Sequence, residues 1–479
     1  MNQHKYPYSR RCLFVALVCV LLMAGGNAPQ AQSKNSGKAS STGNTGWAQV
    51  PAILARIKAP TFPNRDFEIT KFGAVADGQT DNTGAIRKAI AACNQAGGGR
   101  VVVSGGVFLT GAIHLKSNVN LHIAEGATLK FIPDPAKYLP VVLTRFEGTE
   151  CMNFSPPIYA FEQENLAITG KGTLDGSASA ENWWAWKRMG NDDVRRLLEF
   201  NDKGTPVAER IFGEGHKLRV NFIQPYRSRN ILIEGVTINN SPMWEINPVL
   251  CTNVTVRGVT VVSHGPNNDG CNPESSKDVL IENCTFDTGD DCIAIKSGRN
   301  DDGRRIGVPS ENIIVRNSTM KDGHGGVVMG SEISGGVRNV FIENCKMDSP
   351  NLDRALRFKS NAKRGGVIEN IFMRNVEIGR VAEAILTIDF LYETGANGPH
   401  KPVVRNVVIE NVTSASSPRV MWIAGFPGAV ADDIRFINCT FRGVESTEQI
   451  QHAGSISFKN VTIEPAKKGR SRNSPEAKP

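Results

Sequence analysis

The sequence lacks a long apolar run anywhere beyond its N-terminus. Residues 12–26 are apolar but short for a transmembrane helix, and no later stretch is apolar enough to span a bilayer. Because basic residues precede this run, we predict a signal peptide over residues 1–31. The region around Ala31 has neither a clean A-x-A cleavage pattern nor a cysteine placed for a lipid anchor. We therefore expect an exported protein, periplasmic or secreted, without a membrane span.

The body of the chain also lacks a net positive charge, although the formal net charge of the whole chain is +8. Residues 1–31, 32–45 and 465–479 carry +3, +2 and +4, which leaves residues 46–464 at −1. A nucleic-acid-binding surface needs an excess of basic residues on the folded body, so we do not expect one. We predict a Ser/Gly-rich linker and N-terminal extension over 32–60, one folded domain over 61–464 and a basic disordered tail over 465–479.

Helical periodicity is missing from the repeated part of the chain. Nine similar segments recur at intervals of 22 to 36 residues, and two looser copies start at 120 and 165. The nine segments are NILIEGVTI (230), NVTVRGVTV (253), DVLIENCTF (278), NIIVRNSTM (312), NVFIENCKM (339), NIFMRNVEI (370), NVVIENVTS (406), DIRFINCTF (433) and SISFKNVTI (455). Counting the first residue of each as zero, positions 1 and 3 are apolar and position 4 is usually polar. This alternation predicts one β-strand per repeat, and repeats at this period indicate a solenoid.

Two further columns of the repeat support this interpretation. Position 5 holds Asn or Gly, which tolerate a left-handed backbone, so each coil is expected to turn there. Stacked Asn side chains in this column can hydrogen-bond from coil to coil. Position 6 holds Val or Cys in eight of the nine segments, among them Cys284, Cys345 and Cys439. We therefore expect these cysteines to fill a core, although export also permits disulfides.

The architecture that fits is an all-β, right-handed parallel β-helix of about ten coils. The handedness is an expectation from the fold class. Residues 83–96 have apolar side chains on one helical face, and Asp81 or Asn82 can cap the start of that helix. We predict that this short N-terminal helix covers the first coil, as solenoids require a cap.

Polar residues gather at one level of consecutive coils. Asp290 and Asp291 occupy positions 12 and 13 of the coil that starts at 278, and His324 is at position 12 of the coil at 312. Asp269 is at position 16 of the coil at 253, and a three-residue shift brings it level with Asp291. Stacked coils are about 4.8 Å apart. The register therefore predicts one cluster of these four residues.

The next coil adds two cations. If Leu356 and Phe358 point into the core, Arg357 and Lys359 point outward together. Three carboxylates with a histidine suit glycoside hydrolysis, because crowding separates their pKa values into an acid and a base. Arginine and lysine suit an anionic sugar. Each motif alone is more often ordinary turn chemistry or a solvated face, and it is their common register that favours a hydrolase of an acidic polysaccharide.

In this order, NNDG (267–270), GDD (289–291), GHGG (323–326) and RFK (357–359) resemble the four signatures of the polygalacturonases, glycoside hydrolase family 28. The segment FGAVADGQTDNTGAIRKAI (72–90) is similar to the start of many of their β-helices, and the resemblance covers about residues 66–460. Asn268 stands where Thr is common in the family and Phe358 where Ile is common. Neither change removes a catalytic group.

The resemblance implies hydrolysis of α-1,4 bonds between galacturonic acid residues of pectin, with inversion and without a metal or cofactor. It makes Asp290 the general acid, Asp269 and Asp291 the residues that hold and activate water, and His324 an aid to protonating the acid. The candidate substrate-binding residues are Arg357, Lys359, Tyr392 in FLYETG, Asn267 and Lys296. The partner is thus an acidic polysaccharide or oligosaccharide, and we expect a monomer.

Several alternatives remain open from the sequence. The insertion between the repeats at 165 and 230 contains ENWWAWKR (181–188), Arg195, Arg196 and HKLRV (216–220). Its tryptophans either stack on sugars or pack the loop, and if the loop closes one end of the groove, the action is exo. The substrate is alternatively a rhamnogalacturonan or a branched galacturonan. A calcium-dependent pectate lyase and a non-catalytic polysaccharide-binding β-helix are the competing classes.

Overall fold

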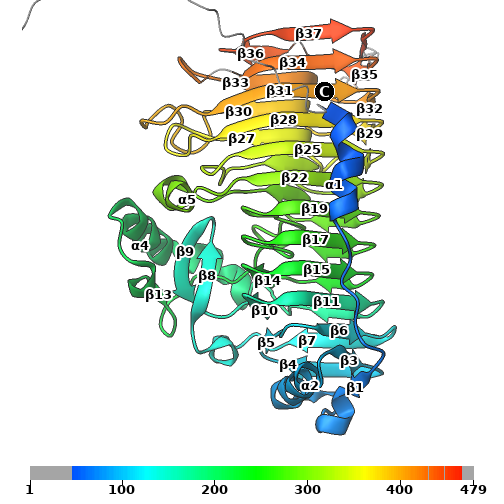
Figure 1. Ribbon diagram of the computed structural model, residues 1–479. Helices are drawn as coiled ribbons and strands as arrows, with labels where there is room; N and C mark the ends of the chain where they lie inside the picture. The colour runs from blue at the N-terminus through cyan, green and yellow to red at the C-terminus, as the bar shows by residue number, and fades with distance from the viewer. Residues whose placement is uncertain (1–45, 430, 447, 467–479) are drawn as a thin grey trace, which may run out of the picture. The chain divides into compact units, whose positions relative to one another are not determined.

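The computed structural model describes residues 46–429, 431–446 and 448–466, and parallel strands dominate it (Figure 1). The predicted signal peptide and most of the predicted tail lie outside these residues. Within the described ranges, no helix is both long and apolar enough to cross a bilayer. Strands from successive coils stack in parallel register, as expected for a right-handed parallel β-helix.

Two sheets of thirteen strands each run through the solenoid. The first, sheet A, consists of β1 (Asp66–Glu68), β3 (Gly99–Val103), β6 (Val119–Ile123), β11 (Glu164–Gly170), β15 (Arg229–Glu234), β17 (Thr252–Arg257), β19 (Lys277–Glu282), β22 (Ser310–Arg316), β25 (Val337–Glu343), β28 (Val367–Arg374), β31 (Val403–Glu410), β34 (Ala431–Ile437) and β37 (Ile456–Lys459). The second, sheet B, consists of β2 (Asp77–Asp81), β4 (Gly106–Thr110), β7 (Ala127–Phe131), β12 (Thr173–Asp175), β16 (Thr237–Asn239), β18 (Thr260–Ser263), β20 (Thr285–Thr288), β23 (Thr319–Met320), β26 (Lys346–Met347), β29 (Glu377–Arg380), β32 (Thr413–Ser416), β35 (Thr440–Val444) and β38 (Thr462–Pro465).

A third face, sheet C, carries the functional residues. Its strands are β5 (Ile113–His114), β10 (Ile158–Phe161) and β14 (Ile223–Tyr226), then β21 (Ile293–Ile295), β24 (Val327–Met329), β27 (Arg354–Lys359), β30 (Ala384–Asp389), β33 (Arg419–Ala424) and β36 (Gln449–Gln451). Single bridges at Ile246 and Cys271 connect β14 to β21, so the ladder is continuous through the coils.

The number of coils exceeds the expected ten because the first two coils lack the asparagine-led segment. The start of the loose copy was also predicted two residues too late. Asn118, and not Asn120, aligns with Asn165 of the next coil and accepts a hydrogen bond from it. The asparagines at position zero and those at position 5 both have positive φ, as at Asn312 (58°) and Asn283 (56°). The sequence predicted a turn at position 5 only. The asparagines at position zero nevertheless form the longer hydrogen-bonded ladder, which includes a bond of 3.1 Å from Asn339 to Asn312.

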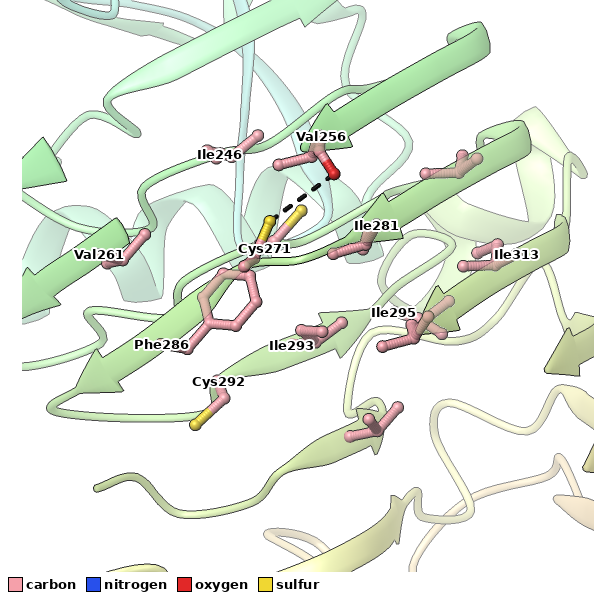
Figure 2. Packing of buried hydrophobic residues seen from close by; sticks show 14 of the residues in the cluster. Ile246, Val256, Val261, Cys271, Ile281, Phe286, Cys292, Ile293, Ile295 and Ile313 are labelled. Carbon is pink, nitrogen blue, oxygen red and sulfur yellow. Dashed lines mark hydrogen bonds between the residues drawn. The ribbon is translucent and has the colours of Figure 1, made fainter. Parts of the chain in front are cut away.

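The interior is one continuous apolar core. The residues at positions 1 and 3, such as Val279 and Ile281, lie in it, and so do Cys284, Cys345 and Cys439. The eight cysteines within the described ranges are all buried and none forms a disulfide. Figure 2 shows Cys271 beside Phe286 and the neighbouring isoleucines. The predicted core role of the cysteine column is therefore confirmed.

Helices are few. The predicted cap is α2 (Thr83–Gln95), which buries Ile86, Ala89, Ile90 and Cys93 against the first coils. Asn82 occupies the N-cap position without a side-chain capping bond, and the Asp81 carboxylate accepts from the backbone amide of Thr83 at 3.0 Å. The remaining helices are α1 (Val50–Arg56), α3 (Trp186–Met189), α4 (Asn191–Asp202) and α5 (Asn300–Ile306), with short 3-10 turns η1 (Gly46–Gln49), η2 (Ile69–Phe72), η3 (Pro135–Tyr138), η4 (Trp183–Ala185) and η5 (Val207–Glu209).

The N-terminal segment lies along the outer face of sheet A (Figure 1). Val50 and Ile53 of α1 pack on position-2 side chains of consecutive coils, among them Leu280 and Ile314. Arg56 then forms an ion pair of 2.7 Å with Asp278. Part of the region predicted as linker and extension is thus bound to the solenoid.

Candidate active site

The site lies where sheet B turns into sheet C. Because Cys271 pairs with Ile293, Asp269 lies level with Asp291, as the three-residue shift predicted. Ile293 also pairs with Val327, which brings His324 level with Asp290. Four residues from three consecutive coils therefore line one pocket of about 250 Å³.

Asp269 is the most deeply placed of the carboxyl groups. It is 2% exposed, and its Oδ2 accepts a hydrogen bond of 2.8 Å from the side-chain amide of Asn272. Burial raises the pKa of Asp269 well above its ordinary range. The positive charge of Lys296 opposes this shift, and the charges of Asp290 and Asp291 add to it. Burial thus favours the neutral form of Asp269 over its carboxylate form.

Asp290 and His324 form a pair. The His324 Nδ1 lies 3.0 Å from Asp290 Oδ1. Burial raises the pKa of Asp290, but the hydrogen bond from His324 and the charge of Lys359 outweigh it, so the net pKa is below the ordinary range. The same hydrogen bond raises the pKa of His324. The proton of this pair therefore lies on the imidazole, within one hydrogen bond of the carboxylate.

Asp291 is bound to the two cations of β27. Its Oδ2 accepts from Lys359 Nζ at 2.6 Å, and Arg357 Nη1 lies 3.7 Å from its Oδ1. The carboxylate is 1% exposed, and Oδ1 has no hydrogen-bond partner among the described residues. Leu356 and Phe358 are in the core, as predicted. Asp291 thus forms an ion pair with Lys359, and its Oδ1 is available as an acceptor.

Lys296 sits deeper than a substrate-binding residue normally does. Its ammonium donates to Gly330 O and Glu332 Oε2, both at 3.1 Å, and lies 3.4 Å from Asp269 Oδ2. It also lies 4.4 Å from the Trp244 ring centre. These contacts surround the ammonium, and they favour a role in holding Asp269 over the predicted contact with substrate.

The other two candidate binding residues also reach the pocket. Tyr392 places its ring 5.9 Å from the Arg357 guanidinium and 5.6 Å from the Lys359 ammonium. Asn267 Nδ2 is 3.5 Å from Asp290 Oδ2, and its carbonyl oxygen accepts from Arg219 at 2.6 Å. Burial lowers the pKa of Arg219 to about 10. Sequence reasoning did not single out Arg219 as a support for Asn267.

The tryptophans of the insertion pack the loop. Trp183 is 1% exposed and lies edge-on to Tyr138 and Trp186. Trp184 donates to Ser241 O at 2.9 Å. None of these rings lines the pocket, which favours the packing alternative, and the insertion contributes Lys187 to the pocket instead.

Arg195 and Arg196 of the insertion also lie away from the pocket. Arg195 pairs with Asp192, and Arg196 lies over the Phe200 ring.

The insertion and an antiparallel hairpin cover sheet C on the N-terminal side of the pocket. The hairpin consists of β8 (Val142–Phe146) and β9 (Thr149–Asn153), to which β13 (Ile211–Phe212) adds a strand. Arg145 of the hairpin binds Glu274 at 2.9 Å, and both side chains are fully buried. Tyr226 of β14 donates to Glu150. The outward face of sheet C is therefore closed below the pocket.

Further pocket residues come from loops that do not repeat. They are Glu147, Lys187, Trp244, Ser331, Glu332 and Glu393. Of these, Lys187 belongs to the segment ENWWAWKR and Glu393 lies beside Tyr392, both of which the sequence had singled out. The others carry no repeat signal, because loop length varies from coil to coil.

A possible cation site lies outside this pocket. Within the described residues, one group has metal-ligand spacing, with His264, Asp287 and Asp322 placing ligand atoms within 4.8 Å of one another. Asp322 already accepts hydrogen bonds from Ser349 and Asn351. In the pocket itself, Lys296, Lys359 and Arg357 occupy the positions next to the carboxylates where a cation would bind.

Comparison with known proteins agrees with this geometry. An exo-poly-alpha-D-galacturonosidase of Dickeya chrysanthemi is 29% identical over 452 residues, covering 83% of this chain and 74% of its own. A probable polygalacturonase of Vitis vinifera is 29% identical over 375 residues, covering 73% and 69%. The crystal structure of a hyperthermoactive exopolygalacturonase from Thermotoga maritima matches with a TM-score of 0.84 and 46% identity, over 87% of this chain and 95% of that one. Residues 208–462 match the family described as Glycosyl hydrolases family 28, and the chain belongs to this family.

Proposed function

We propose that the protein is an exo-acting polygalacturonase that hydrolyses α-1,4 bonds between galacturonic acid residues. The observation that carries this proposal is the single pocket that holds Asp269, Asp290, Asp291 and His324 next to Arg357 and Lys359. Carboxyl groups with different protonation provide acid and base, and the two cations provide sites for sugar carboxylates. The family membership and the polygalacturonase names of the relatives support the same substrate.

In the proposed reaction, His324 passes a proton to Asp290 across their 3.0 Å contact, and Asp290 delivers it to the glycosidic oxygen as the bond to C1 breaks. The raised pKa of His324 favours the charged imidazole that supplies this proton, and the imidazole takes up a proton from solvent after turnover. The free oxygen of Asp291 accepts the proton of the attacking water. Asp269, which Lys296 holds in place, orients that water.

The closed end of the groove supports exo action. On its N-terminal side, the outward polar groups of sheet C, including Gln224 and Asn247, are buried. The fully buried Arg145–Glu274 pair fixes the hairpin there. A polymer is therefore expected to enter by one end only. Chromatography of the products of polygalacturonate tests this: one short product from the earliest times is expected, and early mixed oligomers would contradict exo action.

The stereochemical outcome is part of the proposal. Attack by water on the face opposite the leaving oxygen inverts the anomeric carbon. NMR of the first product should show the β anomer before mutarotation. The α anomer would contradict this assignment.

Two alternatives are distinguished by their products. A rhamnogalacturonan or branched galacturonan hydrolase would release product faster from those polymers than from polygalacturonate. A pectate lyase would form an unsaturated product that absorbs in the ultraviolet and would lose activity with a chelator. The lysines and the arginine beside the pocket carboxylates disfavour the calcium site that a lyase needs.

We also propose export and a monomeric state. The apolar run at residues 12–26 supports export to the periplasm or medium. Fractionation of expressing cells tests the location, and N-terminal sequencing of the mature protein tests cleavage near Ala31. Light scattering tests the oligomeric state.

A further inference from the structure

A second hollow lies on sheet C beyond the active site. It has a volume of about 410 Å³ and is lined by side chains of β30, β33 and β36 and the segments beside them. These strands follow β27 on the side away from the closing hairpin (Figure 1). The hollow is therefore on the side of the pocket from which the rest of a bound polymer has to leave.

The strand register joins the hollow to the active site. Arg357 pairs with Thr387, Thr387 with Trp422, and Trp422 with Gln449. Residues paired in this way in a parallel sheet face the same side. Since strands are about 4.8 Å apart, Trp422 is about 10 Å from Arg357 along the stack. One outward column thus leads from the pocket into the hollow.

Trp422 provides an aromatic surface in this hollow. Its side chain is partly exposed, although the strand around it is buried at Val420, Met421 and Ile423. Within the described part of the chain, no aromatic ring or cation packs on its face. An indole face in a hollow suits the apolar face of a sugar ring, and its N–H remains available as a donor.

Thr387 adds an unused polar group. Its side chain is fully buried, and Oγ1 has no hydrogen-bond partner in the described ranges. A buried hydroxyl without a partner is costly and is expected to meet a ligand or water. Thr387 lines the hollow between Arg357 and Trp422, which is where a sugar hydroxyl would pass.

The charge of the hollow suits an acidic sugar. Glu383 forms an ion pair with Arg354, which also pairs with Asp353. Arg419 is partly buried and donates to Gln449 Oε1 at 2.9 Å, but no carboxylate pairs with it among the described residues. Arg419 is therefore a cation of the hollow without a carboxylate partner in the described residues, and a galacturonate carboxylate complements it.

We propose that Trp422, Arg419 and Thr387 form a distal subsite, which binds a galacturonate unit of the same chain about two strands beyond Arg357. This inference rests on the proposed function for the identity of the chain. The ring of that unit stacks on Trp422, its carboxylate pairs with Arg419, and a hydroxyl of the intervening sugar bonds to Thr387. The subsite strengthens binding of long chains only, because a short one ends before reaching it.

Calorimetry in the Asp290→Asn background tests the subsite without turnover. Digalacturonate and hexagalacturonate are titrated into this protein and into the same protein with Trp422→Ala, Trp422→Phe or Arg419→Gln. We expect Trp422→Ala and Arg419→Gln to weaken hexagalacturonate binding about five- to tenfold and digalacturonate binding less than twofold. Trp422→Phe keeps a ring and should lose less than Trp422→Ala. Arg442→Gln on sheet B is the matched control and should change neither affinity.

Two outcomes would overturn the subsite. Equal losses for both ligands would mean that Trp422 acts through the fold, and thermal unfolding of each variant identifies that case. Unchanged hexagalacturonate affinity in both Trp422→Ala and Arg419→Gln would mean that the chain does not reach the hollow. Failure of the proposed function appears separately, as a lack of hydrolysis of any galacturonan by the unaltered protein.

Discussion

Three carboxyl groups share one pocket, and each group has different neighbours. Burial raises the pKa of Asp269, His324 holds the pKa of Asp290 below its ordinary range against the effect of burial, and Asp291 forms an ion pair with Lys359. The free protein thus stores the donor's proton on His324 and not on Asp290. Catalysis requires that this proton return to Asp290 during the reaction.

Removing the donor carboxyl is the most direct test of this assignment. Asp290→Asn should lower kcat on polygalacturonate about 10²–10⁴-fold, since an amide cannot protonate the leaving oxygen. Release of reducing ends measures this rate. Thermal unfolding and the affinity for digalacturonate should change little, because Asn keeps the size and the contact with His324. A loss below tenfold would contradict the role of Asp290.

The pH profile should report the proton stored on His324. Because the pKa of His324 is raised, the wild-type rate should persist above pH 6.5 and fall as the imidazole loses its proton. In His324→Gln the proton has to be held by a carboxyl alone. The alkaline limb of kcat should then move toward acid pH by at least about one unit. An unmoved alkaline limb would contradict the proton store.

Among the elements, α1 shows what the N-terminal segment contributes. It is too short to be stable by itself and exists because sheet A offers an apolar stripe. Position 2 of five consecutive repeats forms this stripe, with Leu280, Ile314, Phe341, Phe372 and Val408. Trp47 extends the contact, with Arg374 lying 3.8 Å from its ring centre. The helix therefore covers side chains of several coils that would otherwise face water.

Shortening one α1 side chain should weaken this cover. Ile53 is 2% exposed, so Ile53→Ala should lower the free energy of unfolding by about 2 kcal/mol. Urea unfolding followed by tryptophan fluorescence measures the change. Ala52→Ser on the exposed side of the helix is the control and should stay within about 0.5 kcal/mol. Equal effects of the two variants would show that the packing of Ile53 is not what stabilises the cover.

The solenoid as a whole shows which features are predictable from a sequence. Its periodic parts could be predicted, since Asn283, Cys284 and Phe358 each occupy a position that recurs from coil to coil. The match of Asp269 with Asp291 followed from the same register. The contacts of Lys296 and Arg219 did not follow, because they depend on loops of unequal length that fold over sheet C. The burial of Trp183 is of the same kind, since no repeat constrains the insertion.

Closure of one end of the groove has a consequence for long substrates. If the polymer enters by its end only, the number of chain ends limits the rate, whatever the total number of bonds. Below saturation and at a fixed mass concentration, the initial rate should therefore rise in proportion to the number of chain ends as polygalacturonate is shortened from long to intermediate lengths. Reducing-end release measures the rate, and viscometry should show little early loss of viscosity. An initial rate that is independent of chain length, with a rapid fall in viscosity, would mean that the hairpin held by Arg145 and Glu274 leaves the groove open.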